Sequence, residues 1–312
     1  MYIEWNSQTL EEVKKIFVFD KNIKEVEIHM EDWTCRVNYI FDHVMYIIET
    51  HPQINFNIST DCPIEISNKP NNLKVKWNPD TGYLNKAYKQ AKSLNLSTNK
   101  NIKNTVCSFN GGYTEQRTAL CLLLYKHDLW TNENCSKIFV ANTDCLKNTH
   151  KINKHIQSLG QKNIKQFLKQ QNNIEGKTVN YAHRASVQKS IMDNTFINVI
   201  GGPGDEHPAI SPYVDEKIFM PIINRSLWIM CSTPGWYAYL EKHYGFKLFH
   251  DVIDYKFDSI VDWEDRLLHI MDQLVQLDGL SRSKQNEIYE QQKEIIDYNY
   301  NHLVSRQWAN LN

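Results

Sequence analysis

Short apolar runs alternate with amphipathic stretches along the whole chain. In the first hundred residues, the runs at 25–30, 54–59 and 74–77 have the period of strands. Residues 35–50 and 83–94 have apolar positions at helical spacing. The first of these helices is expected to stop at His51-Pro52, because a residue that precedes proline avoids helical backbone angles. This order predicts a small α/β domain.

A second alternating series follows a polar stretch at 95–104, which we interpret as a linker. Strands are predicted at 105–109, 137–140, 195–200 and 227–230, and helices at 115–127, 152–170 and 262–277. A short helical run from Asp215 is expected to be interrupted by Pro221. The turn Ser232-Thr233-Pro234-Gly235 is expected to start a helix that ends at Gly245. One long last helix is predicted over 282–308, with an apolar stripe at Ile288, Ile295, Tyr298 and Leu303.

Strands that alternate with helices indicate parallel sheets. We therefore predict an α/β fold with two Rossmann-like domains that face each other across a cleft. Residues 1–100 would form a first α/β domain, residues 101–280 a second α/β domain that binds a nucleotide, and residues 281–312 a helix that packs back toward the first domain. Ligands of such folds bind beyond the carboxyl ends of the strands.

Composition narrows the class of protein. The formal net charge of −1 argues against binding of polyanions by the molecule's overall charge. The seven cysteines are scattered and form no CxxC pair, which predicts neither a disulfide framework nor a zinc site and favours a reducing cytoplasm. The polar, acid-containing start has no secretory signal, and no apolar run reaches the roughly 20 residues that span a bilayer. A cytoplasmic protein without a membrane span is expected.

The segment Phe109–Arg117 (FNGGYTEQR) is the first candidate site. A strand ends there, Gly111 and Gly112 free the backbone, and Thr114 can cap the next helix. Backbone N–H groups at such a start can hold a phosphate, and the guanidinium of Arg117 can bind a second oxygen. A plain turn followed by a helix is the alternative interpretation.

The segment Asp215-Glu216-Lys217 is the second candidate. A carboxylate at Glu216 suits the hydroxyls of a ribose, and the ammonium of Lys217 suits a diphosphate that leaves. Tyr213 just before it, and His207 in the glycine-rich loop at 201–207, could also contact the phosphate or sugar of a bound nucleotide. A capped helix start with a surface ion pair, beside an ordinary surface loop, is the alternative.

Two further groups of charged residues have competing interpretations. Glu31 and Asp32 follow the first predicted strand and could act as a general base, although acids are also favoured at helix starts. Two segments rich in lysine contain no acid, one between Asp80 and Glu115 and one between Asp144 and Glu175. They could bind a polyanion such as DNA or form solvated helix faces. The lysines chosen as candidates for nucleic-acid binding are Lys86, Lys89, Lys151 and Lys154.

Taken in order, TEQR, EKIFMPI, the turn STPG, GFKLF and VIDYKFD resemble a family of phage and large-virus glycosyltransferase-like proteins. The start at Glu216-Lys217 is also similar to that of fucosyltransferase-type GT-B enzymes. The resemblance covers roughly residues 104–277, and Asp215 stands where the family usually has threonine. It implies that Arg117 and Lys217 bind the donor diphosphate and Glu216 the ribose. Pro221, Gly235, Gly245 and Phe246 would shape the fold.

The resemblance implies a GT-B-like, metal-independent enzyme that uses a nucleotide sugar, such as a UDP- or GDP-sugar, and no separate cofactor. Its acceptor would be a glycan or a hydroxymethylated base in viral DNA, in the cytoplasm of a host cell, and the protein would be a monomer or homodimer. One alternative is a non-catalytic protein that binds nucleic acid or glycan. Another is a kinase or phosphoribosyl-type transferase, which the lack of a Walker or Rossmann glycine pattern disfavours.

Overall fold

The computed structural model describes residues 2–5, 22–30, 38–60, 66, 68–78, 82–94, 100–111, 113–137, 139–171, 189–202, 214 and 216–310. The chain divides into two compact units. The first comprises Met1–Lys86, Glu206–Val214 and the last residue, and the second comprises Ala87–Asp205 and Asp215–Leu311. The division between Lys86 and Ala87 falls inside helix α3 (Gly82–Leu94). We predicted it at residue 100, and residues 95–99 of the predicted linker lie outside the described residues.

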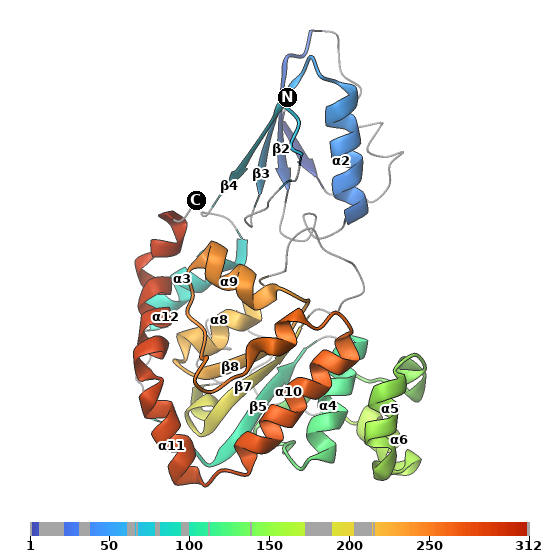
Figure 1. Ribbon diagram of the computed structural model, residues 1–312, viewed down its shortest axis with the longest axis vertical. Helices are drawn as coiled ribbons and strands as arrows, with labels where there is room; N and C mark the ends of the chain where they lie inside the picture. Colours follow the sequence, from blue (N-terminus) through green and yellow to red (C-terminus); the bar gives the residue numbers. More distant parts are fainter. Residues whose placement is uncertain are drawn as a thin grey trace. The chain divides into compact units, whose positions relative to one another are not determined.

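The first unit contains a parallel sheet with one helix beside it (Figure 1). The strands β1 (Tyr2–Trp5), β2 (Glu25–Met30), β3 (Asn55–Thr60) and β4 (Leu73–Trp77) lie in the order β1-β2-β3-β4. Helix α2 (Asn38–Thr50) connects β2 to β3. The sequence did not predict β1, because its four residues are too few to show a period.

Only one face of this first sheet is deeply buried. Along β2, Val26, Ile28 and Met30 are buried while the residues between them are more exposed. Val44 and Ile48 of α2 belong to the same apolar cluster as these strand residues. An alternating pattern with one helix against it is what a half-covered sheet requires.

The second unit contains four parallel strands, β5 (Asn104–Asn110), β6 (Cys135–Lys137), β7 (Thr195–Gly201) and β8 (Leu227–Cys231). Their order is β6-β5-β7-β8. The chain therefore moves from β5 to one side to form β6 and then returns to the other side of β5 to form β7. The strand order reverses between β5 and β7, and this is the point where open α/β sheets bind ligands.

Helices cover both faces of the second sheet, since every residue of β7 and β8 is buried. Helices α4 and α10 pack against each other, and α10 also packs on β5 and β8. Helix α8 packs on β7 and β8, and α12 packs against α8. Right-handed crossovers that move in opposite directions along a sheet place α4 and α8 on opposite faces (Figure 1). The helices are α4 (Glu115–Lys126), α5 (His150–Ile156), α6 (Gln161–Lys169), α8 (Glu216–Ile223), α9 (Trp236–Tyr244), α10 (Trp263–Asp278), α11 (Arg282–Gln291) and α12 (Lys293–Ser305). The short 3₁₀ segments are η2 (Thr143–Leu146), η3 (Gln157–Leu159), η4 (Tyr255–Ser259) and η5 (Gln307–Asn310).

The coarse prediction of an α/β protein with two parallel sheets and helices at its end is confirmed. Helix α9 follows Gly235 and ends at Gly245 as predicted, where a φ of 70° suits glycine. Among the described residues, no helix combines the length and the apolar character needed to cross a membrane.

Four details of the prediction are wrong. The strand predicted at 137–140 is β6, which ends at Lys137. Pro221 lies inside α8 and does not interrupt it. The helix is short, and Phe219 and Ile222 within it are buried. Tertiary packing therefore outweighs the backbone hydrogen bond that is lost because proline has no N–H. The helix predicted over 152–170 is two helices, because Gly160 at a φ of 75° breaks it.

The predicted long last helix is also two helices, and Gln292 separates them. The backbone N–H of Gln292 is shared between the carbonyls of Ile288 and Tyr289, each at 3.1 Å, which tightens the turn. The buried face therefore differs from the predicted stripe. It includes Gln285, Tyr289, Gln292, Ile296, Asn299 and Leu303.

Candidate functional site

Helix α4 begins just beyond the carboxyl end of β5, where the sequence predicts a phosphate-binding turn. Thr114 has extended backbone angles, and its side-chain oxygen accepts a hydrogen bond from the backbone N–H of Arg117 at 3.1 Å. This confirms Thr114 as the cap of α4. Gly111 directly follows β5, while Gly112 lies outside the described residues.

The side chain of Arg117 lies across the ends of two neighbouring strands. Its Nε donates a hydrogen bond to the backbone carbonyl of Gly201, the last residue of β7, at 3.0 Å. A Cβ atom added at Gly201 would stand 2.6 Å from Cγ of Arg117 and 2.7 Å from Oδ1 of Asn110, the last residue of β5. Arg117 is only 7% exposed. A guanidinium is thus buried where the strand order of the sheet reverses.

Buried oxygen atoms without a hydrogen-bond partner lie at the same edge of the sheet. Within the described part of the chain, Oδ1 of Asn110, Oγ of Ser232 and Oγ1 of Thr233 have none. Asn110 ends β5, and Ser232 and Thr233 follow β8. A buried polar group without a partner costs about 1–3 kcal/mol, so such groups indicate where water or a ligand binds.

One small cavity adjoins Ser232. It has a volume of about 10 Å³ and is lined by side chains that include Gln116, Ser232 and Arg266. This volume admits one water molecule and no nucleotide. The strand ends and helix starts around this cavity therefore form the larger candidate surface at this edge.

Helix α8 brings the second predicted cation toward the same edge. It packs on β7 and β8, and the turn Asn224–Ser226 connects it to the start of β8. It therefore runs antiparallel to β8, so its first residues, Glu216 and Lys217, lie toward the carboxyl ends of the strands. The side chain of Lys217 is half-buried. The side chain of Glu216 and the predicted residues Glu31, Asp32, His207 and Tyr213 lie outside the described residues.

The start of α9 is occupied by the protein itself. The carboxylate of Asp258 accepts hydrogen bonds from the backbone N–H groups of Tyr237 at 3.2 Å and Ala238 at 3.3 Å. Burial raises the pKa of Asp258, while these N–H bonds oppose that effect. The turn before α9 therefore binds an internal carboxylate and is not available to an external phosphate. Of the helix starts at this edge, those of α4 and α8 remain candidates.

The lysines predicted to bind nucleic acid lie in two separate places of the fold. Lys86 and Lys89 are exposed on α3, whose second half contacts α12 through a hydrogen bond from Tyr300 to the carbonyl of Ala91. Lys151 and Lys154 are exposed on α5, which packs on α4 and α10. Lys151 forms ion pairs with Asp262 at 3.2 Å and Asp265 at 2.5 Å, and these acids raise its pKa.

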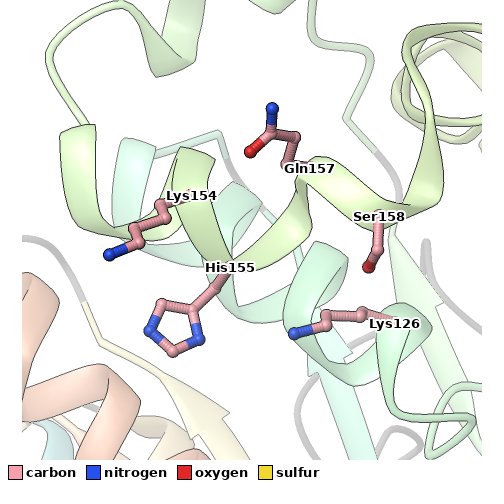
Figure 2. A pocket seen from close by; sticks show the side chains of 5 residues that line it. All are labelled: Lys126, Lys154, His155, Gln157 and Ser158. Atoms are coloured by element: carbon pink, nitrogen blue, oxygen red, sulfur yellow. The ribbon is translucent and has the colours of Figure 1, made fainter.

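Lys154 lines two open hollows that the sequence did not predict. One hollow, of about 520 Å³, is lined by Lys126, Lys154, His155, Gln157 and Ser158 (Figure 2). The other, of about 490 Å³, shares Lys154 and Gln157 and adds Lys147, Asn153 and Gln161 among others. The first hollow joins Lys126 of α4 to residues at the end of α5, and a single sequence does not show such a pairing.

Among the described residues, no group of three or more His, Cys, Asp or Glu side chains is arranged to hold a metal ion. Comparison with known protein families finds no family that matches this chain. Curated proteins and solved structures likewise give no significant match. The resemblance to phage and large-virus glycosyltransferases, and the activity it implies, therefore stay predictions from the sequence.

Proposed function

We propose that the protein is a glycosyltransferase that uses a nucleotide-sugar donor, and that the donor diphosphate binds at the carboxyl edge of the second sheet. The observation that carries this proposal is the position of Arg117, buried between the ends of β5 and β7. Ligands of open α/β sheets bind at this reversal of strand order. The resemblance of the segments around Arg117, Lys217 and Gly235 adds independent support from the sequence.

The chemistry needs positive charge where the nucleoside diphosphate leaves. In the proposed reaction, an acceptor hydroxyl attacks the anomeric carbon, the bond from that carbon to the diphosphate oxygen breaks, and negative charge grows on the departing oxygen. The guanidinium of Arg117 and the ammonium of Lys217 would stabilise that charge, each near a helix start whose dipole acts in the same sense. No metal ion is required in this scheme.

The first unit would then supply the acceptor side of a GT-B-like enzyme. Glu31 or Asp32 would remove the proton from the attacking hydroxyl, and Glu216 would bind the ribose. The acceptor would be a glycan or a hydroxymethylated base in DNA. The roles of Glu216 and of the acceptor follow from the resemblance. The role of Glu31 or Asp32 follows from their position directly after a strand in the sequence.

Protection of the fold by nucleotide sugars tests the donor site. UDP- and GDP-sugars are added to the wild type, to Lys217→Ala and to Lys293→Ala while thermal unfolding is followed. A donor at one hundred times its Kd should stabilise the wild type by about 2.7 kcal/mol. The Lys217→Ala protein should lose most of this protection.

Lys293→Ala is the matched control, because Lys293 is also in the first turn of a helix and pairs with Glu290 at 3.8 Å on the surface. It should keep the full protection. Absence of protection in the wild type with every nucleotide sugar would overturn the proposal. Equal loss of protection in both variants would remove Lys217 from the site.

A further inference from the structure

The larger open hollow is built from the ends of two helices. Lys126 is in the last turn of α4, and Lys154 and His155 are in the last turn of α5. Figure 2 shows the ammonium of Lys126 pointing toward the ring of His155, with the hydroxyl of Ser158 nearby. The ends of α4 and α5 thus bring Lys126 and His155 to one hollow, which Lys154, Gln157 and Ser158 also line.

A purely structural explanation for these cations is that they neutralise the negative ends of the helix dipoles. Each helix end carries roughly half a negative charge, so the two ends amount to about −1. Lys126 and Lys154 bring two positive charges. The lining therefore keeps a positive excess that the helix ends do not cancel.

No carboxylate lines either hollow among the described residues. The polar side chains around them belong to Lys, His, Gln, Ser, Thr and Asn, all of which can donate hydrogen bonds. Lys147, which lines the second hollow, forms an exposed ion pair with Asp144 at 3.0 Å. The charge of Lys126 also contributes, after burial, to the lowered pKa of the adjacent His127.

The shape of the surface favours a polymer over a small anion. Pockets for small ligands enclose most of the ligand surface. Here two open hollows of about 520 and 490 Å³ adjoin along a shared wall of Lys154 and Gln157. Such a surface can contact successive phosphates of one strand, which Lys, Ser, Gln and Asn side chains typically bind in nucleic-acid complexes.

We propose that the two hollows around Lys154, at the ends of α4 and α5, bind backbone phosphates of a nucleic acid. The site is distinct from the donor edge. Lys126 stands at the opposite end of α4 from Arg117, about 14 Å away along the helix axis at 1.5 Å per residue. Binding here needs no nucleotide sugar, so the proposal can fail or succeed independently of the glycosyltransferase proposal.

The test measures the salt dependence of DNA binding. Anisotropy of a fluorescent 20-base-pair duplex is recorded between 50 and 300 mM NaCl without any nucleotide sugar, a range chosen because phosphate contacts weaken steeply there. The wild type should bind with a negative slope of log K against log salt. The double variant Lys126→Ala, Lys154→Ala should reduce the size of this slope by about 1.8, at about 0.9 for each lost contact with duplex DNA.

The matched control is Lys162→Ala, Lys165→Ala. Both lysines are exposed on α6 in the same acid-free segment, and neither lines a hollow. The control removes the same charge and should leave the slope nearly unchanged. If the test variant does not fold, the pair Lys126→Gln, Lys154→Gln removes the same charge but keeps most of the length and the polar end of each side chain, and it gives the same comparison.

Three outcomes would overturn the proposal. The wild type could fail to bind the duplex and also a single strand of the same sequence. Both double variants could lower the slope equally, which would indicate general attraction without a site. Tripolyphosphate could raise the melting temperature of the wild type only, with no DNA binding, which would identify a site for small anions.

Discussion

The Nε atom of Arg117 donates a hydrogen bond to the backbone carbonyl of Gly201, and this bond ties the start of α4 to the end of β7. The two residues are 84 positions apart in the sequence. Their contact holds a positive charge at the reversal of strand order and requires that position 201 has no side chain. The same contact thus links the stability of the sheet edge to the chemistry proposed there.

Gly201→Ala should therefore destabilise the protein. The new Cβ would stand 2.6 Å from Cγ of Arg117, so the arginine or the strand end must shift. We expect a loss of about 1–3 kcal/mol in the free energy of unfolding by urea. Gly279→Ala is the control, because its Cβ would have no neighbour closer than 3.4 Å and its φ of −64° suits alanine. Equal urea midpoints for the two variants would contradict the close packing at Gly201.

A second prediction concerns Arg117 and Lys217 together. If both cations contact one diphosphate, the effects of Arg117→Lys and Lys217→Ala on the binding of a nucleotide sugar should not add. We expect an interaction energy of about 0.5–3 kcal/mol from a double-mutant cycle measured by calorimetry. The Arg117→Lys protein keeps the charge but loses the planar donor group. Strict additivity would show that the two cations act on separate places.

Much of the fold could be predicted from local pattern. The strand β8 is a continuous apolar run, β7 is mostly apolar, and α4 has the expected cap at Thr114. The missed features depend on tertiary contacts. Only packing determines that α8 continues through Pro221.

The candidate site was predictable only in part. The glycines and Arg117 after β5 form a local pattern at a strand end, and that pattern is visible in the sequence. The roles of Asn110 and Ser232 depend on which strand ends lie side by side, and Lys126 meets His155 only through the packing of α4 on α5. The charge pattern alone also could not distinguish Lys151, which is ion-paired, from Lys154, which lines both hollows.

This difference between neighbouring lysines gives a third prediction. Lys151→Ala should leave the salt slope of DNA binding unchanged, because Asp262 and Asp265 already neutralise this ammonium. The single variant Lys154→Ala should lower the slope by about 0.9 on duplex DNA. The two lysines are on the same helix and both exposed, so each serves as the control of the other. A larger effect of Lys151→Ala than of Lys154→Ala would contradict the assignment.

A fourth prediction concerns a buried amide on α12. Oδ1 of Asn299 accepts from the backbone N–H of Lys247 at 2.8 Å, and its Nδ2 donates to the carbonyl of the same residue at 2.9 Å. Asn299→Ala would remove both partners from the segment after Gly245. We expect a loss of about 2–4 kcal/mol, since each unsatisfied buried group costs about 1–3 kcal/mol. Urea unfolding measures it, and the exposed Asn301→Ala, which should change stability by less than about 0.5 kcal/mol, is the control. Equal stabilities of the two variants would show that the two hydrogen bonds from Asn299 to the backbone of Lys247 contribute little to stability.

The last prediction is a pH dependence that arises from Lys100. Its ammonium donates to the carbonyls of Met192 and Thr195 and to the hydroxyl of Ser226, with no carboxylate among these partners. Burial lowers the pKa of Lys100 from 10.5 to about 8, against the opposing charge of Asp193. The charged form is therefore disfavoured in the folded state. This penalty is complete below pH 8 and is relieved as the pH rises toward 10.5.

Stability of the wild type should consequently rise relative to Lys100→Met between pH 8 and pH 9. In this range the unfolded chain binds more protons at this residue than the folded chain, by about half a proton at pH 8 and about nine-tenths at pH 9, which amounts to about 1 kcal/mol over the interval. Burial raises the pKa of the Cys107 thiol to about 12. Above pH 9 such a thiol loses its proton in the unfolded chain but not in the folded one, so the free energy of unfolding falls. Because this thiol is present in both proteins, the difference between wild type and variant isolates Lys100. Urea unfolding at pH 7, 8 and 9 measures this difference, and a constant value across the three would show that the pKa of Lys100 is not lowered by folding.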